Sequence, residues 1–399
     1  MSQNTAIAIV GTFDSKGEEH LFLKERIEQR GFRTLTINVG TKGPSAFPPD
    51  RDFYGEVLEN SRGGPKSRDE AVKAVIVEAQ KLVRRLHSEG KICGIISSGG
   101  GTGTHLGTSI MSVLPLGVPK VMVSTVASRN MAKIVGTIDI TMMHSVVDIL
   151  GVNSILGEIL DRAAGAICGM VESQWKPQRE RNRIALTMFG FITRAAEGIK
   201  QSLEGMGYEV IPFHANGTGG MAMENLAGEG LFHGILDLAT HELADAMMGG
   251  YCGGIGPERL EPIPGRNIPR LVVPGGLDCA VLEFTRQNVP DQFKDRKVFF
   301  YDFRSAIRLN ERESVMLAQK LADKLNRNPS LTKVVIPMGG WSEADCKDGA
   351  LYDPATSAIF IKELKQDLDP RIEIREVDNH INDPSFAQVA SAIMDEMIQ

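Results

Sequence analysis

Aromatic side chains, paired cysteines and long apolar runs are scarce in this chain of 399 residues. Phe, Trp and Tyr make up only 6% of it, so the core must be mainly aliphatic and methionine. The five cysteines include no CxxC pair, which excludes a disulfide scaffold and predicts reduced thiols in a cytoplasmic protein. No apolar run reaches about 18 residues and the N-terminus lacks a signal-peptide pattern. We therefore expect no membrane partner.

A surplus of basic charge is also missing. The 44 Lys and Arg residues stand against 50 Asp and Glu, which gives a net charge of -6. Proteins that bind nucleic acid usually carry a basic surface, so we expect no nucleic-acid partner. A local basic pocket for a small anion is compatible with this balance. Glycine, in contrast, is abundant at 42 residues.

Short apolar strands alternate with amphipathic helices in the first half of the chain. We predict helices over residues 18–30 and 67–88. The predicted strands are residues 5–11, 33–39, 92–97, 118–124 and 134–138. This alternation is typical of an α/β domain with a doubly wound parallel sheet.

The same order of elements returns in the second half. Strands are expected at 184–189, 209–213, 231–237 and 268–275, with helices at 195–206 and 385–398. A glycine-aromatic pair, Gly31-Phe32 and then Gly207-Tyr208, follows the first helix of each half. We predict two Rossmann-like domains, residues 1–175 and 183–399, joined by a short polar linker at 172–182. The alternative is that ordinary βα regularity produces the match.

Two glycine-rich loops follow strands of the first half, where α/β sheets bind ligands. In residues 11–18, Lys16 supplies positive charge, and Asp14 can cap the helix or hold Mg²⁺ through water. Residues 97–104 contain four glycines that allow a phosphate close to the backbone. Residues 124–129 form a third, hydroxyl-rich loop. Neither a P-loop nor a GxGxxG pattern occurs, so tight strand-to-helix turns remain the alternative.

Polar side chains also follow the strands of the second half. His214, Glu224, Asp237 and Asp278 are candidates for acid-base catalysis, because neighbouring strand ends bring such groups together. The sequence HELAD at 241–245 is not HExxH, which excludes a zincin site. The alternative is that these residues cap helices. Arg308 and His380 are weaker candidates.

Several motifs occur together in a familiar order: GTFDSKGEE, SSGGGTGT, HANGTGGMAME, LDLATHELAD and HINDP. With them, the chain resembles a family named for its ATP-binding likeness to a tomato mosaic virus resistance protein. The resemblance implies two Rossmann-like domains, ATP with Mg²⁺ in the first of them, and a homodimer. By position it assigns the metal to Asp14 and ATP to Gly11, Thr12, Asp14, Ser15, Lys16, Gly99, Gly100, Gly101, Thr102, Gly103, Thr104, Thr125 and Ser128.

The sequence departs from the family pattern at residues 300–308, FYDFRSAIR, where a His-Asn-Pro run is expected and only Arg308 remains. If the expected run serves an activity of the second domain, that activity is altered or lost in this chain. The function we expect is an ATP-dependent enzyme that acts on a small polar substrate between the domains. Two alternatives stay open: a nucleotide-sensing regulatory protein without turnover, and a nucleotide-independent sugar-acid lyase or hydrolase.

Overall fold

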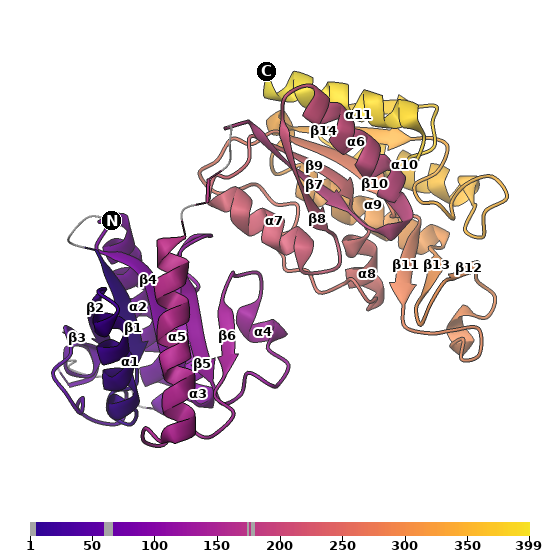
Figure 1. Ribbon diagram of the computed structural model, residues 1–399. Helices are drawn as coiled ribbons and strands as arrows, with labels where there is room; N and C mark the ends of the chain where they lie inside the picture. The colour runs from indigo at the N-terminus through magenta and orange to yellow at the C-terminus, as the bar shows by residue number, and fades with distance from the viewer. Residues whose placement is uncertain (1–4, 60–66, 174, 177–179) are drawn as a thin grey trace. The chain divides into compact units, whose positions relative to one another are not determined.

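The computed structural model describes residues 5–59, 67–173, 175–176 and 180–399 (Figure 1). The chain divides into two compact units, residues 1–176 and 177–399. Part of the predicted linker, residues 174 and 177–179, lies outside the described residues. Within the described ranges, no helix is long and apolar enough to cross a membrane.

The first unit is built on a parallel sheet of six strands in the order β3-β2-β1-β4-β5-β6. In that order the strands are Arg51–Asp52, Arg33–Asn38, Ala6–Gly11, Ile92–Gly99, Lys120–Ser124 and Thr141–His144. The helices are α1 (Gly17–Gln29), α2 (Arg68–Ser88), α3 (Gly101–Met111), α4 (Ala132–Val135) and α5 (Ser154–Glu172), with a π-helical turn at Tyr54–Glu59.

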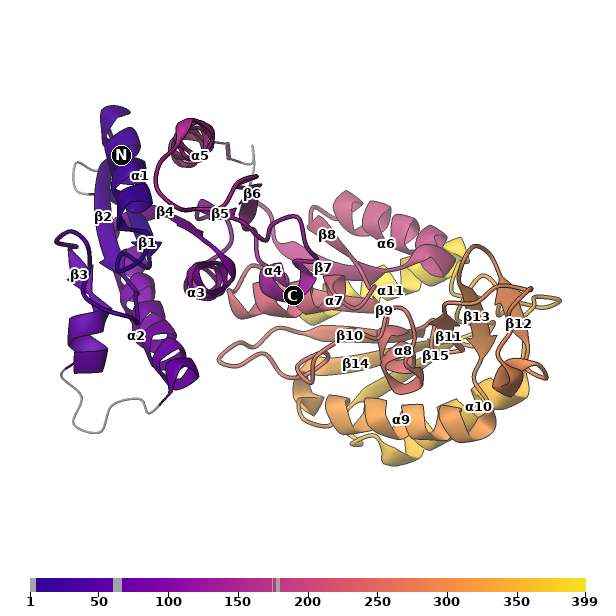
Figure 2. The ribbon, with the colours of Figure 1, turned by 90° about the horizontal axis from the view of Figure 1, so that it is seen from below.

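Strand β1 shows why this sheet is covered on both faces. All six of its residues are buried, and successive side chains point to opposite sides. Ala8 and Val10 pack with residues of α2 and α3, whereas Ile7 and Ile9 pack with residues of α1 and α5. Figure 2 shows these two helix layers. The sheet is therefore doubly wound, as predicted.

The second unit has its own parallel sheet, in the order β15-β14-β10-β9-β7-β8. In that order the strands are Glu373–Val377, Thr332–Pro337, Arg270–Gly275, Gly234–Ala239, Arg183–Met188 and Glu209–His214. Helices α6 (Thr193–Gly205) and α11 (Pro384–Ile398) pack on one face. The other face carries α7 (Gly219–Gly228), α8 (Glu242–Met248), α9 (Glu311–Leu325) and α10 (Pro354–Asp367). Short 3₁₀ turns occur at Gly190–Ile192, Asp291–Phe293 and Pro329–Leu331.

The prediction of two parallel, Rossmann-like sheets is confirmed. The order β2-β1-β4-β5 in one sheet matches β8-β7-β9-β10 in the other, so the repeat seen in the sequence is a repeat of strand order. Gly31 and Gly207 explain the repeated glycine-aromatic pair. Each follows the first helix of its unit with a positive φ, +85° and +100°, which glycine adopts without strain.

Two features of the fold were not predicted correctly. The strand predicted at 134–138 is wrong: α4 ends at Val135, and Gly136 with φ 56° turns the chain. The edge strand is β6, whose sequence TMMH has only two apolar residues, both partly exposed, and so gives little apolar signal. A small antiparallel sheet was missed as well. It consists of β11 (Cys279–Leu282), β13 (Ser305–Arg308) and β12 (Val298–Phe300), and the atypical segment 300–308 belongs to it.

Candidate functional site

The strand order of the first sheet reverses between β1 and β4, and a pocket lies at the carboxyl ends of these two strands. In open α/β sheets this switch point is where ligands bind. The pocket has a volume of about 210 Å³. We call it the N-terminal pocket. It is lined by Thr12, Asp14, Ser15, Lys16, Thr41, Lys42, Arg68, Gly100, Gly101, Thr102, Gly103 and Leu106. The structure thus brings the two predicted glycine-rich loops together.

Two helices begin at this pocket. Helix α1 starts after Lys16 and α3 starts after Gly100, and neither N-cap residue accepts a hydrogen bond from a helix amide through its side chain. The first amide groups of a helix are then available to an anion, which the helix dipole also favours. A Cβ atom placed on Gly101 would meet nothing within 4 Å, so the backbone is open toward the pocket there.

Two basic residues of this pocket were missed in the sequence. Lys42 follows β2, the neighbour of β1, and Arg68 is the first residue of α2. The position of Lys42 could have been found, because carboxyl ends of neighbouring parallel strands meet at one sheet edge. Arg68 does not follow a strand, so no comparable sequence pattern pointed to it. The predicted cation, Lys16, also lines the pocket, and its ammonium group contacts the carbonyl of Ile149.

Asp14 connects the first loop to the segment after β2. Its Oδ2 accepts a hydrogen bond from the amide of Lys42 at 2.8 Å, while its Oδ1 is buried without a partner among the described residues. A Cβ atom at Gly40 would lie 2.5 Å from the Asp14 carboxyl carbon, so glycine is required there. A carboxylate is a suitable ligand for Mg²⁺, which commonly keeps several waters and takes one or two protein carboxylates. No group of three or more metal-ligating side chains occurs in the described part of the chain.

His20 fixes the spacing of the two loops, although the sequence did not point to it. It is fully buried below Gly11, where a Cβ atom would lie 2.0 Å from its Nε2. Its Nδ1 donates to the carbonyl of Lys16 at 2.6 Å, and its Nε2 accepts from the amide of Ser98 at 3.3 Å. Burial lowers the pKa of His20, which keeps the ring neutral and able to make both bonds.

The remaining predicted ATP residues lie around the pocket rather than in its lining. Gly11 and Gly99 are buried strand ends, and a Cβ atom at Gly99 would lie 2.8 Å from the Cα of Gly103. Thr104 is buried and shares a hydrogen bond with Ser124. Thr125 donates its amide to Gly99, and Ser128 is exposed. Their roles in binding stay predictions.

The corresponding switch point of the second sheet, between β7 and β9, is occupied by side chains. Phe189 follows β7 and stacks on His241, which follows β9, with ring centroids 3.8 Å apart. A Cβ atom at Gly276 would clash with the ring of Phe189 and with the Cβ of His241. Both ring nitrogens of His241 lack partners among the described residues, and burial lowers its pKa to about 3. The two sheets therefore share a strand order but differ in the side chains at the switch point.

Two of the four predicted catalytic residues meet in a network of buried charges. The network, named here the buried charge network, consists of Glu224, Asp237, Glu242, Arg259 and Arg270. Arg259 contacts all three carboxylates at 2.6 to 3.0 Å, and Arg270 contacts Glu224 and Asp237. Burial opposes ionisation of Glu224, but Arg270 and Arg259 outweigh it and lower its pKa. This arrangement holds the Glu224 carboxylate in its charged form, paired with both arginines.

Asp278 belongs to a different group of side chains. Its Oδ2 accepts a hydrogen bond from Ser342 at 2.8 Å, and Arg308 lies between Asp278 and Asp345. Burial raises the pKa of Asp278, and burial together with the charge of Asp278 raises the pKa of Asp345 to about 7. The ring of His380 contacts the Ser342 carbonyl at 2.9 Å. The fourth candidate, His214, is exposed at the end of β8.

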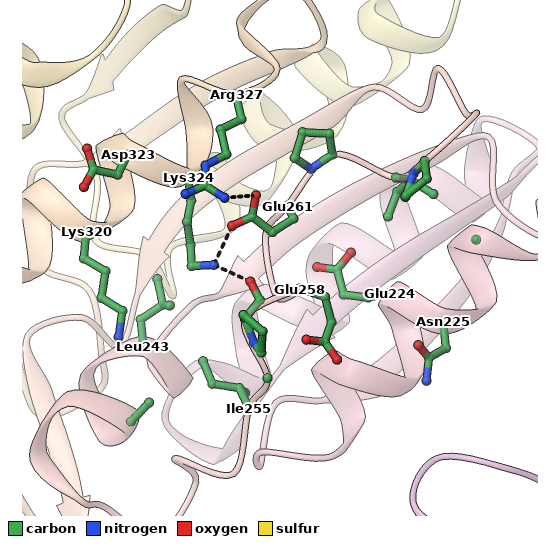
Figure 3. A pocket seen from close by; sticks show the side chains of 17 residues that line it. Glu224, Asn225, Leu243, Ile255, Glu258, Glu261, Lys320, Asp323, Lys324 and Arg327 are labelled. Carbon is green, nitrogen blue, oxygen red and sulfur yellow. Dashed lines mark hydrogen bonds and ion pairs between the residues drawn. The ribbon is translucent and has the colours of Figure 1, made fainter. Parts of the chain in front are cut away.

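A larger pocket opens above the buried charge network, between α7, α8, the segment at 255–264, and α9 (Figure 3). We call it the C-terminal pocket; its volume is about 910 Å³. Glu224 forms part of its lining, together with unlike charges such as Lys320 and Glu258. Lys324 and Arg327 both contact Glu261 in its wall, at 3.0 and 2.8 Å. Such a mixture of apolar and charged walls suits a small polar molecule.

Residues 5–176 match the N-terminal domain, and residues 181–398 the C-terminal domain, of the uncharacterised protein family UPF0261. The chain belongs to this family. It is 37% identical over 394 residues to a UPF0261 protein of Clostridium tetani, with 96% of each chain covered.

The resemblance to the tomato protein is confirmed. The chain is 29% identical over 427 residues to the ToMV resistance protein Tm-1(GCR237) of Solanum lycopersicum, with all of this chain but 56% of the tomato protein covered. Among solved structures, UDP-N-acetylglucosamine 2-epimerase from Rickettsia bellii matches with a TM-score of 0.23 and 11% identity, covering 99% of this chain and 95% of that one. A TM-score this low supports no argument about function.

Proposed function

We propose that the first unit binds ATP with Mg²⁺ and that its phosphates occupy the N-terminal pocket. The observation that supports this proposal is the convergence of two helix N-termini with Lys16, Lys42 and Arg68 at the sheet's switch point. Backbone amides and cations together form the usual surroundings of a bound phosphate. Asp14 would hold the metal together with phosphate oxygens and water.

In this proposal the protein is an ATP-dependent enzyme with a small polar substrate. The C-terminal pocket supports it, because its volume lies in the range of about 300–1,000 Å³ that is common for small-molecule sites. A second candidate is a nucleotide-sensing protein without turnover. It is favoured by Glu224 and Asp237, since carboxylates held between two buried arginines are poorly suited to acid-base catalysis.

The test of ATP binding uses Gly101, a glycine with free space where a side chain would project. Gly101→Val adds a side chain where a Cβ meets nothing within 4 Å, so it should fold normally and obstruct the pocket. Gly169→Val is the matched control, because Gly169 is an exposed helical glycine of the same unit with the same free space. Calorimetry with ATP and Mg²⁺ should show binding by the wild type and the control only. Equal affinity in Gly101→Val would contradict the placement.

Turnover separates the two candidates. Steady release of ADP over many cycles, with or without an added substrate panel, supports the enzyme. Tight ATP binding with no ADP released supports the sensor.

We also propose a homodimer. Val146, Leu150 and Ile155 in one short stretch of the first unit are each more than half exposed, which is typical of a surface that a partner covers. Sedimentation of the wild type should show a dimer, and Leu150→Asp should shift it toward a monomer.

A further inference from the structure

We infer that the N-terminal pocket recognises the polyphosphate chain of its ligand and not the base. The ligand class would then be nucleoside triphosphates in general, with inorganic tripolyphosphate as the smallest member. This inference rests on the proposed function and specifies which part of ATP the protein recognises.

The size of the pocket is the first argument. Its volume of about 210 Å³ lies below the range of about 300–1,000 Å³ for pockets that enclose a drug-sized ligand. A complete nucleotide is of drug size, so the pocket can enclose only part of it. The helix N-termini and cations mark that part as the phosphates.

The lining is the second argument. Its side chains are hydroxyl, charged or absent, and Leu106 is the one large apolar residue among those that the structure describes there. Bases are usually held by stacking on aromatic or apolar side chains and by groups that read their edges. No aromatic residue lines the described pocket, so no aromatic ring is available there to stack on a base.

The charges are the third argument. The lining contains three cationic side chains, Lys16, Lys42 and Arg68, and one carboxylate, Asp14. They come from three separate segments, after β1, after β2 and at the start of α2. A positive surplus spread over three segments suits a chain of several phosphates better than a single phosphate.

Calorimetry with four probes, each with Mg²⁺, tests the inference: ATP, GTP, sodium tripolyphosphate and AMP. We expect the first three to bind with dissociation constants within about ten-fold of each other, and AMP to bind at least about ten-fold more weakly, because each lost charged contact costs about that much. A preference for ATP of about a hundred-fold over GTP and tripolyphosphate would overturn the inference and leave ATP binding intact. If no triphosphate bound, the proposed function would fail too. Binding of tripolyphosphate without binding of ATP or GTP would refute both the inferred ligand class and the proposed function.

Two variants identify the residues responsible. Lys42 and Arg68 are exposed, so Lys42→Gln and Arg68→Gln should fold normally. Each should weaken ATP, GTP and tripolyphosphate by the same factor, about ten-fold. Lys73→Gln is the control, because Lys73 is an exposed cation of the same helix α2 that does not line the pocket. Wild-type affinity in both variants, or loss for one nucleotide alone, would overturn the inference.

Discussion

Replacing Arg259 by methionine tests whether the buried charge network serves stability. Arg259 is fully buried and contacts Glu224 at 3.0 Å, Asp237 at 2.6 Å and Glu242 at 2.9 Å. Methionine replaces the aliphatic part of the side chain, but it leaves Glu224 and Asp237 with Arg270 alone and removes the arginine that pairs with Glu242. Removing one partner of a buried ion pair costs about 3–5 kcal/mol, and here one group serves three partners. We therefore expect a loss at the upper end of that range.

This loss is large compared with the total stability of a domain, about 5–15 kcal/mol. Urea denaturation followed by tryptophan fluorescence can measure it, because Trp341 is buried in the second unit whereas Trp175 is 84% exposed. Stability of the variant should recover in part as the pH falls, since the unpaired carboxylates then take up protons in the folded state.

Two further variants serve as controls. Arg266→Met removes an exposed arginine nearby and should change stability by less than about 1 kcal/mol. Adding Glu224→Gln to Arg259→Met should restore part of the loss, because it removes one of the uncompensated charges. A loss below about 1 kcal/mol for Arg259→Met alone would refute the reasoning.

Three other predictions concern buried titratable groups. His20→Ala removes the partner of the Ser98 amide and leaves a cavity, so thermal denaturation should show a loss of about 2–4 kcal/mol. The pKa of His241 is about 3 in the folded protein against 6.5 unfolded, so stability should fall as the pH drops below 6.5, by about 1.4 kcal/mol per unit; His241→Leu should flatten this slope in urea titrations. The pKa of Asp345 is raised to about 7, so its contribution has the opposite sign, and stability is lost as the pH rises from about 4 to 7. Asp345→Asn should remove that loss, and an unchanged pH profile would contradict the assignment.

The sequence predicted the sheets well because their signals are local. Buried strands such as β1 are continuous apolar runs, and glycines with positive φ mark the ends of helices. Strand β6 escaped prediction because an edge strand buries few side chains and needs little apolar character. The antiparallel strands β11 to β13 are only three or four residues long, which is too short for a periodic pattern.

The candidate site was predictable only in part. The two glycine-rich loops follow strands directly, so their meeting at one sheet edge could be expected. The contribution of Arg68 depends on how the chain returns to α2, which no local pattern encodes. The partners of Glu224 and Asp237 lie 22 to 46 residues away, and only the tertiary structure shows that they are arginines.

The stacked pair of Phe189 and His241 has a consequence for how a nucleotide affects the melting of each unit. These rings stack at the second sheet's switch point, whereas the first sheet has a pocket at the corresponding place. The apolar clusters of the two units share no residue. A ligand stabilises only the part of a protein whose folded form binds it. Calorimetric scanning with nucleotide should therefore shift the melting of the first unit upward and leave that of the second where it was.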